Sequence, residues 1–203
     1  MFRRLQRRLS RYLLLLYAKS RICYYRLLSD HSIQEGILVQ PALAIGAGTI
    51  NIEDGVKIGY WPSPHFLSTV CHIEVRYQSS IISIGRRTHI NNGFVAVAEK
   101  CTIKIGQNCL IGTRCEIYDS DFHPVNVEDR IAGNLHSCHD IMIGDNVFIG
   151  SNVRILKGVT IGSGSVIANS AVVTKDIPAD CVAAGVPARV IRQLSPKTNA
   201  PQL

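Results

Sequence analysis

Hydrophobic residues recur every six positions through much of this chain. From Ile143 onward the sequence reads as six consecutive hexads, IGDNVF, IGSNVR, ILKGVT, IGSGSV, IANSAV and VTKDIP, and weaker runs begin at Ile45 and Ile84. The first place is aliphatic, the second is often Gly, and the fourth is often Gly or Asn. An inward aliphatic side chain can stack on its equivalent one coil later, and Gly and Asn tolerate the left-handed backbone angles of tight corners. The repeat predicts triangular coils of three short strands, with coils stacked about 4.8 Å apart.

The six-residue rhythm fails at a histidine. Ile105, Ile111 and Ile117 keep the spacing, but the next place holds His123, and the following hexads begin only at Ile143. Since 143 − 123 = 20 is not a multiple of six, we expect a loop over about 124–140. Long loops on rigid scaffolds are where functional residues gather, and the proline that follows the histidine restricts it to an extended conformation. His123 is therefore the leading candidate for a functional residue.

Residues 1–30 form a separate, basic segment that reads as a helix, with no Pro or Gly. Phe2, Leu5, Leu9, Leu13 and Leu16 recur at threes and fours, with arginines between them. The apolar run YLLLLYA is too short to span a membrane, and it lacks the flanks of a secretory signal. Two interpretations stay open, a helical cap on the domain and an amphipathic helix lying on an anionic membrane surface.

The charge distribution separates this segment from the body of the protein. The whole chain carries 22 basic and 15 acidic side chains, of which residues 1–30 hold eight and one. The remaining residues therefore hold 22 − 8 = 14 basic and 15 − 1 = 14 acidic groups and are neutral. A neutral body argues against a protein that binds nucleic acid along its surface. The length of 203 residues suggests one domain, or one domain with an appendage.

The seven cysteines are odd in number and form no CxxC pair, which argues against a zinc ribbon or a thioredoxin-like motif. Cys109 and Cys115 occupy the small place of the repeat. Since free cysteine packs as a small hydrophobe, we expect buried, reduced thiols in a cytoplasmic protein.

Three segments resemble the hexapeptide-repeat acetyltransferases, including galactoside and maltose O-acetyltransferases and the O-acetyltransferases of bacterial surface polysaccharides. They are the His-Pro before the loop, the block IGSNVRILKGVTIGSGSVIANSAVVTKDIP, and AAGVPARVIR. The resemblance implies an all-β fold, a left-handed parallel β-helix over residues 31–182. An N-terminal helical segment would precede it, and a cap and tail over 183–203 with a short C-terminal helix would follow it. The hand comes from the resemblance, because parallel crossovers are generally right-handed. The resemblance also implies acetyl-CoA as co-substrate and a homotrimer with sites between subunits.

In the resembling enzymes the histidine of the His-Pro pair is the general base. By this likeness His123 takes the proton of an acceptor hydroxyl, and the hydroxyl oxygen attacks the thioester of acetyl-CoA. An imidazole suits the role of general base near neutral pH. The backbone N–H of Ser151 is the expected oxyanion donor. Asp119 and Asp121 are either the acids that orient the imidazole or solvated corner residues.

The resemblance also places the donor. Backbone amides near Ser151 and Asn169 would meet the pantetheine arm, and Phe148 stands where relatives carry a tryptophan. Four further residues match positions near the nucleotide end, where cations suit phosphates: Thr174, Lys175, Arg189 and Arg192. The two arginines are alternatively solvated charges at a helix end.

On the acceptor side, three residues are candidates. Asn92 matches an asparagine that contacts the sugar in the galactoside enzyme. Glu99 lies one place from that enzyme's acidic partner, which argues against galactoside itself as the substrate. Trp61 is either an aromatic platform for a sugar ring or part of a plain surface loop.

A metal site is not expected. The γ-class carbonic anhydrases use the same fold with three histidine ligands, which would here be His123, His136 and His139. The last two lie in the expected loop, where nothing fixes their geometry.

Taken together, these features predict an acetyl-CoA-dependent O-acetyltransferase that acts on a sugar hydroxyl of a cell-surface polysaccharide or its precursor. If the basic helix lies on the membrane, the enzyme would act at the inner face of that membrane. Two alternatives stay open. One is an N-acetyltransferase for a nucleotide-linked amino sugar, and the other is a non-catalytic β-helix that serves as a scaffold or glycan-binding module.

Overall fold

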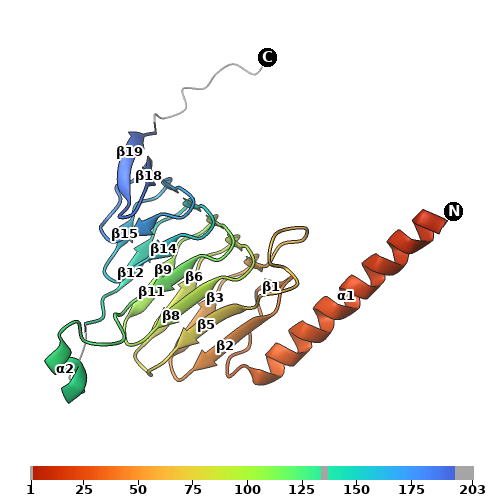
Figure 1. The fold of residues 1–203 in the computed structure, drawn as a ribbon, viewed down its shortest axis with the longest axis horizontal. Coiled ribbons are helices and arrows are strands. Elements are labelled where there is room, and N and C mark those ends of the chain that lie inside the picture. The colour runs from red at the N-terminus through yellow and green to blue at the C-terminus, as the bar shows by residue number, and fades with distance from the viewer. Residues whose placement is uncertain (1, 134–136, 195–203) are drawn as a thin grey trace, which may run out of the picture.

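The computed structural model describes residues 2–133 and 137–194. A triangular β-helix of stacked coils forms the body, and the long helix α1 (Phe2–Leu28) leaves it at the N-terminal end (Figure 1). None of the helices in the described part of the chain is both long enough and apolar enough to cross a membrane.

The strands form three sheets, one for each side of the triangle. The first sheet contains β1 (Ile37–Leu38), β4 (Lys57–Ile58), β7 (His89–Ile90), β10 (Leu110–Ile111), β13 (Phe148–Ile149), β16 (Val166–Ile167), β18 (Cys181–Ala184) and β19 (Arg189–Gln193). The second contains β2 (Ala42–Gly46), β5 (Cys71–Val75), β8 (Val95–Ala98), β11 (Glu116–Tyr118), β14 (Arg154–Ile155) and β17 (Val172–Val173). The third contains β3 (Thr49–Ile52), β6 (Ile81–Ile84), β9 (Thr102–Ile105), β12 (Ile141–Ile143) and β15 (Thr160–Ile161).

The strand register confirms the predicted parallel coils. Phe148 on β13 pairs in parallel with Val166 on β16, so one turn of the helix takes three hexads. Leu110 on β10 pairs in parallel with Phe148, and that turn is much longer than three hexads. The additional residues form the loop between β11 and β12, which carries the short helix α2 (Val127–Ala132).

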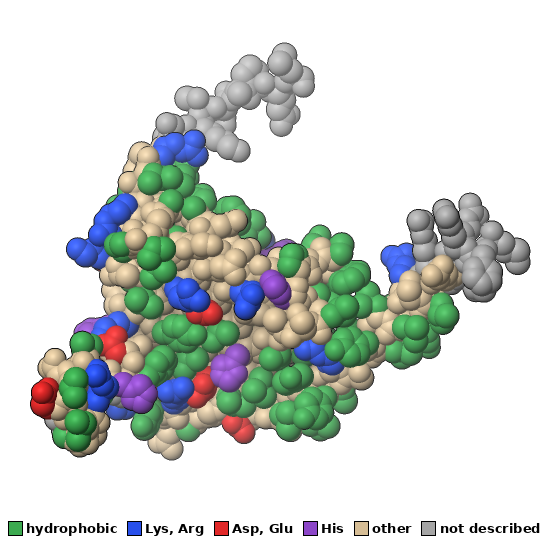
Figure 2. Space-filling view, viewed as in Figure 1, with side chains coloured by type: hydrophobic (Ala, Val, Ile, Leu, Met, Phe, Trp, Pro, Cys, Tyr) green, Lys and Arg blue, Asp and Glu red, His purple; other side chains and the backbone are tan. Residues whose placement is uncertain are grey.

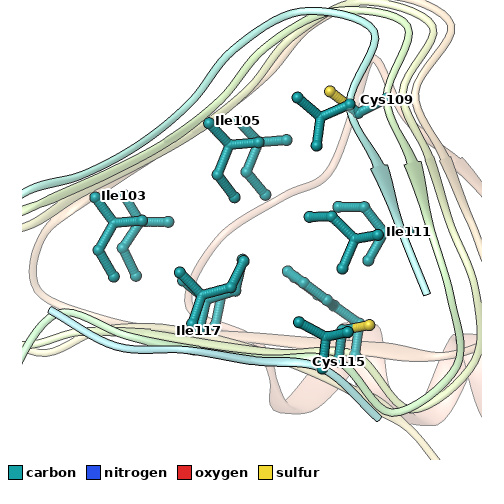
Figure 3. Close-up of a cluster of buried hydrophobic side chains, with 14 of the residues drawn as sticks. Ile103, Ile105, Cys109, Ile111, Cys115 and Ile117 are labelled. Carbon is teal, nitrogen blue, oxygen red and sulfur yellow. The ribbon is translucent and has the colours of Figure 1, made fainter. Parts of the chain in front are cut away.

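The interior consists of stacked aliphatic side chains, as the hexads predict (Figure 3). Ile105, Ile111 and Ile117 point into it and are at most 3% exposed. Each such side chain contributes about 1.5–3 kcal/mol when fully buried. Cys109 and Cys115 are buried free thiols, as expected, and burial raises the pKa of Cys115 to about 12. These cysteines therefore stay neutral and pack as small hydrophobes.

Two expectations are wrong. The chain after Cys181 forms no C-terminal helix in the described residues; β18 and β19 instead make an antiparallel hairpin that extends the first sheet. The β-branched Val190 and Ile191 favour a strand, and the edge of β18 supplies its hydrogen-bond partners. Nor are all the cysteines buried and reduced: Cys101 and Cys138 form a disulfide, and Cys23 is exposed. The spacing hides this pair, because the loop brings together residues that are 37 apart.

Candidate functional site

The predicted site residues fall on two different corners of the triangle. We name the turn from the first sheet to the second the first corner, and the turn from the second sheet to the third the second corner. Successive turns stack by backbone hydrogen bonds: at the first corner Asn152 N–H donates to the Thr113 carbonyl, and Ser170 N–H donates to the Ser151 carbonyl. Trp61, Asn92, Ser151 and Asn169 lie along the first corner, and Phe148 lies on the strand that leads into it. Glu99, Asp119, Asp121, His123, Thr174 and Lys175 lie along the second.

A largely apolar groove of about 660 Å³ runs along the first sheet to the first corner. Trp61, Leu110 and Phe148 line it, each with about half of its side chain exposed, and Ile37, Tyr60 and His89 lie beside them. Sequence reasoning placed Trp61 and Phe148 at opposite ends of the reaction, as acceptor and donor contacts. The structure brings both to a single groove that suits a flat or partly apolar ligand.

Asn92 shapes this groove without facing it. The side chain is fully buried; its amide donates to the carbonyls of Tyr60 (3.0 Å) and Pro64 (2.9 Å), and its oxygen accepts from the Tyr60 N–H (3.0 Å). These bonds hold the loop of residues 59–70, on which Trp61 packs against Phe66 with ring centroids 5.1 Å apart. The structure therefore gives Asn92 the role of a loop anchor, where the sequence suggested contact with the acceptor.

The Ser151 amide is already occupied. Its N–H donates to Asn169 Oδ1 at 2.9 Å, and its hydroxyl accepts the Thr113 N–H at 3.2 Å. Asn169 is exposed. A ligand oxygen could take the place of Asn169 Oδ1, because an exposed amide can turn into water at little cost.

His123 stands at the second corner, at the base of the long loop. Its side chain is exposed, and within the described residues the imidazole has no hydrogen bond or ion pair. Phe122, directly before it, adopts the left-handed backbone conformation (φ 59°), and its N–H donates to Ser120 Oγ at 2.9 Å. The Phe122 ring packs edge-on against Tyr118 and lies 4.6 Å below the Arg76 guanidinium. We name these contacts of Phe122 the Phe122 clamp.

The clamp fixes the direction in which the chain leaves the coil, and so the place of the histidine. The sequence analysis did not identify the residues of the Phe122 clamp as functional residues. The available signal was a bulky aromatic residue at a corner, where the repeat often has Gly or Asn.

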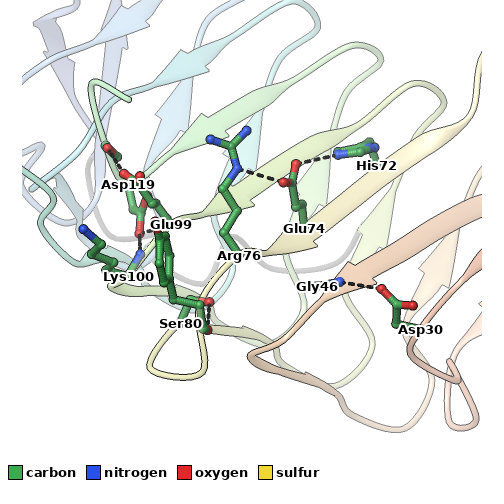
Figure 4. Close-up of polar contacts among 11 residues, drawn as sticks. Asp30, Gly46, His72, Glu74, Arg76, Ser80, Glu99, Lys100 and Asp119 are labelled. Atoms are coloured by element: carbon green, nitrogen blue, oxygen red, sulfur yellow. Dashed lines mark hydrogen bonds and ion pairs between the residues drawn. The ribbon is translucent and has the colours of Figure 1, made fainter. Parts of the chain in front are cut away.

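Asp119 is fully buried beneath this corner (Figure 4). Its carboxylate accepts the backbone N–H groups of Glu99 (2.8 Å), Cys101 (2.9 Å) and Lys100 (3.3 Å). These bonds hold the turn of the coil below, so the carboxylate is neither a solvated corner group nor directed at the imidazole. Glu99 is nearly buried as well, and its carboxylate accepts the Ser120 hydroxyl.

Asp121 is exposed and forms an ion pair with Lys157, while the Ser137 hydroxyl also donates to its carboxylate. This pair ties the start of the loop to the next coil. The basic residues predicted near the nucleotide end are exposed: Lys175 at the second corner, and Arg189 and Arg192 on β19.

One cluster has the side chains of a metal site. Ligand atoms of Cys101, Asp119 and Cys138 lie within 4.8 Å of one another, but the two sulfur atoms are bonded together in this structure. Of the three-histidine arrangement weighed from the sequence, His136 lies outside the described residues.

Comparisons with known proteins agree with the fold. The family model described as bacterial transferase hexapeptide (six repeats) matches residues 140–175, and that of the hexapeptide repeat of succinyl-transferase matches residues 102–132. The galactoside O-acetyltransferase of Escherichia coli (strain K12) is 44% identical over 118 residues, which cover 56% of this chain and 57% of that protein. The chain spans 38% to 61% of the length of the curated relatives that it matches over about 120 residues.

Two solved structures are similar over most of their length. The polySia-specific acetyltransferase NeuO is 30% identical with a TM-score of 0.57, and the match covers 82% of this chain and 85% of that one. A hexapeptide-repeat acetyltransferase from Vibrio cholerae, complexed with acetyl-CoA, is 26% identical with a TM-score of 0.54, and 88% of each chain is covered.

Proposed function

Because the chain belongs to the hexapeptide-repeat transferase family, we propose that it transfers an acetyl group from acetyl-CoA to a hydroxyl of a sugar, in a polysaccharide or its precursor. The observation that carries the proposal is His123, an exposed imidazole without a partner among the described residues, set at the base of the loop by the Phe122 clamp. The winding is left-handed in this proposal, as in the family that the sequence resembles.

In the proposed reaction the His123 imidazole accepts the proton of the acceptor hydroxyl. The hydroxyl oxygen forms a bond to the thioester carbonyl carbon, and the carbonyl oxygen becomes an oxyanion. The Ser151 N–H stabilises that oxyanion once Asn169 Oδ1 has turned away from it. The carbon–sulfur bond then breaks, and the imidazolium returns the proton to the CoA thiolate. The products are an acetyl ester and free CoA.

A single chain cannot bring these parts together. His123 leaves the second corner, whereas the groove and Ser151 belong to the first. We infer a homotrimer in which His123 of one subunit faces the groove of the next. Thr174, Lys175, Arg189 and Arg192 are exposed cations and hydroxyls that suit the nucleotide phosphates.

The acceptor is best supported as a sugar. Trp61 and Phe148 offer aromatic surfaces in the groove, on which the apolar face of a sugar ring can pack. Two of the similar proteins are named galactoside O-acetyltransferase and polySia-specific acetyltransferase, and both names denote carbohydrate acceptors. An amino-sugar acceptor is separated from a hydroxyl acceptor by the product, because base cleaves the ester and leaves the amide.

The first experiment measures acetyl-CoA binding and transfer in the wild type, in His123→Ala and in His139→Ala, which removes an exposed histidine from the same loop. We expect saturable acetyl-CoA binding by calorimetry in all three proteins. Transfer to a panel of sugars should fall about 10²-fold or more in His123→Ala alone. Equal transfer by His123→Ala and the wild type would refute the general base and favour a scaffold or glycan-binding module.

A second experiment tests whether neighbouring chains share a site. His123→Ala is co-expressed with a double variant, Trp61→Ala with Phe148→Ala, which removes the walls of the groove. If each site takes its histidine from one chain and its groove from the next, random mixing leaves both parts intact at one interface in four. We expect about a quarter of wild-type activity from two inactive parents. No recovery in mixed oligomers would show that the site lies within one chain.

A further inference from the structure

The helix α1 makes limited contact with the body. It is about 40 Å long, and its N-terminal end projects well clear of the β-helix (Figure 1). The contact side carries the half-buried Leu14, Ala18, Ile22 and Tyr25, spaced at threes and fours. Arg21 secures this side through hydrogen bonds from its guanidinium to the carbonyls of residues 67 (3.0 Å) and 69 (2.7 Å).

The opposite side of α1 is apolar and exposed. Leu9, Leu13, Leu16 and Leu27 are 57%, 55%, 49% and 81% exposed, and at 100° per residue they share a face that points away from the body. Hydrophobic side chains also run along the projecting helix in the space-filling view (Figure 2). The body therefore does not cover the main apolar face of this helix.

Positive charge borders that face. Arg8, Lys19 and Arg26 are exposed along one flank of the helix, and the sequence has no acidic residue before Asp30. A second copy of the same helix would place like charges against these groups. An anionic lipid surface supplies both the opposite charge and an apolar layer for the leucines.

We propose that α1 docks the protein on an anionic lipid surface, with the leucine face entering the acyl boundary and the bordering cations meeting lipid phosphates. Arg21 and the half-buried side fix the helix to the β-helix, so the body is held beside the membrane. The proposal rests on the helix alone and does not depend on the acetyl-transfer reaction.

The test is sedimentation of the full-length protein with vesicles of phosphatidylcholine alone and with vesicles of phosphatidylcholine mixed with phosphatidylglycerol. We expect strong partition to the anionic vesicles that falls as salt rises. Arg8→Gln with Lys19→Gln should weaken it roughly 25-fold, about fivefold for each cation. Leu13→Gln with Leu16→Gln should weaken it about tenfold or more at every salt concentration.

Matched controls lie elsewhere on the surface. Arg86→Gln removes a 63%-exposed charge, and Ile131→Gln an 83%-exposed apolar side chain, and neither should change partition. Since Leu and Gln have similar helix propensities, circular dichroism should show that α1 persists in the leucine variant. Equal sedimentation with and without vesicles would overturn the proposal. The proposal would also be overturned if the leucine variant changed its oligomeric state without losing lipid binding. That result would assign the leucine face to contacts between copies of the protein.

Discussion

Replacing Asp119 with Asn separates a structural carboxylate from a catalytic one. The residue is four positions before His123, which makes it a natural partner for the imidazole. In the structure its two oxygens instead accept backbone N–H groups of residues 99–101, in a place closed to water. We therefore expect Asp119→Asn to destabilise the fold and to affect catalysis only through that loss.

The magnitude follows from the hydrogen bonds. The Asp119 Oδ2 atom accepts from all three amides, and Oδ1 accepts again from the Glu99 N–H. An asparagine keeps one oxygen, but its NH₂ group must then face an N–H. Hydrogen bonds to a charged group contribute about 1.5–3 kcal/mol, against about 1 kcal/mol for a neutral pair, and a buried donor without an acceptor costs about 1–3 kcal/mol. From these values we expect a loss of about 2–4 kcal/mol in the free energy of unfolding.

The assay is urea unfolding at one fixed protein concentration, because the stability of an oligomer depends on concentration. Asp121→Asn is the matched control, since that carboxylate is exposed and paired with Lys157, and it should lose less than about 1 kcal/mol. A wild-type unfolding curve for Asp119→Asn, together with a large fall in kcat and an altered pH profile, would contradict our reasoning. The carboxylate would then orient His123.

Two further results are expected. Phe122→Gly keeps the left-handed backbone but removes the ring that packs against Arg76. We expect kcat to fall about tenfold or more, with little change in the KM for acetyl-CoA. An equal rise in that KM would indicate a loss of acetyl-CoA binding instead. Thiol titration without reductant should find one reactive cysteine in the native protein, Cys23, then five after denaturation and seven after reduction. Seven thiols in the denatured protein before reduction would show that the Cys101–Cys138 bond is absent.

The β-helix could be predicted from the sequence because its repeat is local. Each hexad contains its own inward residue and its own corner, so counting by sixes identifies strands such as Leu110–Ile111 and Arg154–Ile155. The same count located the loop through the phase error between His123 and Ile143. The hairpin of β18 and β19 lies beyond the last hexad, where the repeat carries no information.

The roles of the polar residues could not be predicted in the same way. Asn92 bonds to the carbonyls of Tyr60 and Pro64 in an earlier loop, and Asp119 bonds to the backbone of the preceding corner turn. The repeat indicates which residues stack, but not which side chain turns inward at a corner to satisfy the backbone of the turn below. A buried polar residue at a corner therefore resembles a site residue in the sequence, and only its hydrogen bonds distinguish the two.

If His123 and the groove serve one reaction, the separation of the two corners requires a neighbouring subunit. The packed isoleucines of the interior lie between His123 and the groove that holds Phe148, so rotation of a side chain cannot bring the two together. The loop cannot carry the histidine around the triangle either, because the Phe122 clamp holds its base against Arg76 and Tyr118. If both parts serve one reaction, the second corner of one copy must meet the first corner of another. That contact joins two different surfaces, and repeated contacts of this kind form a ring when the rotation between copies closes. Recovery of activity from two inactive variants is therefore the result that the fold itself leads us to expect.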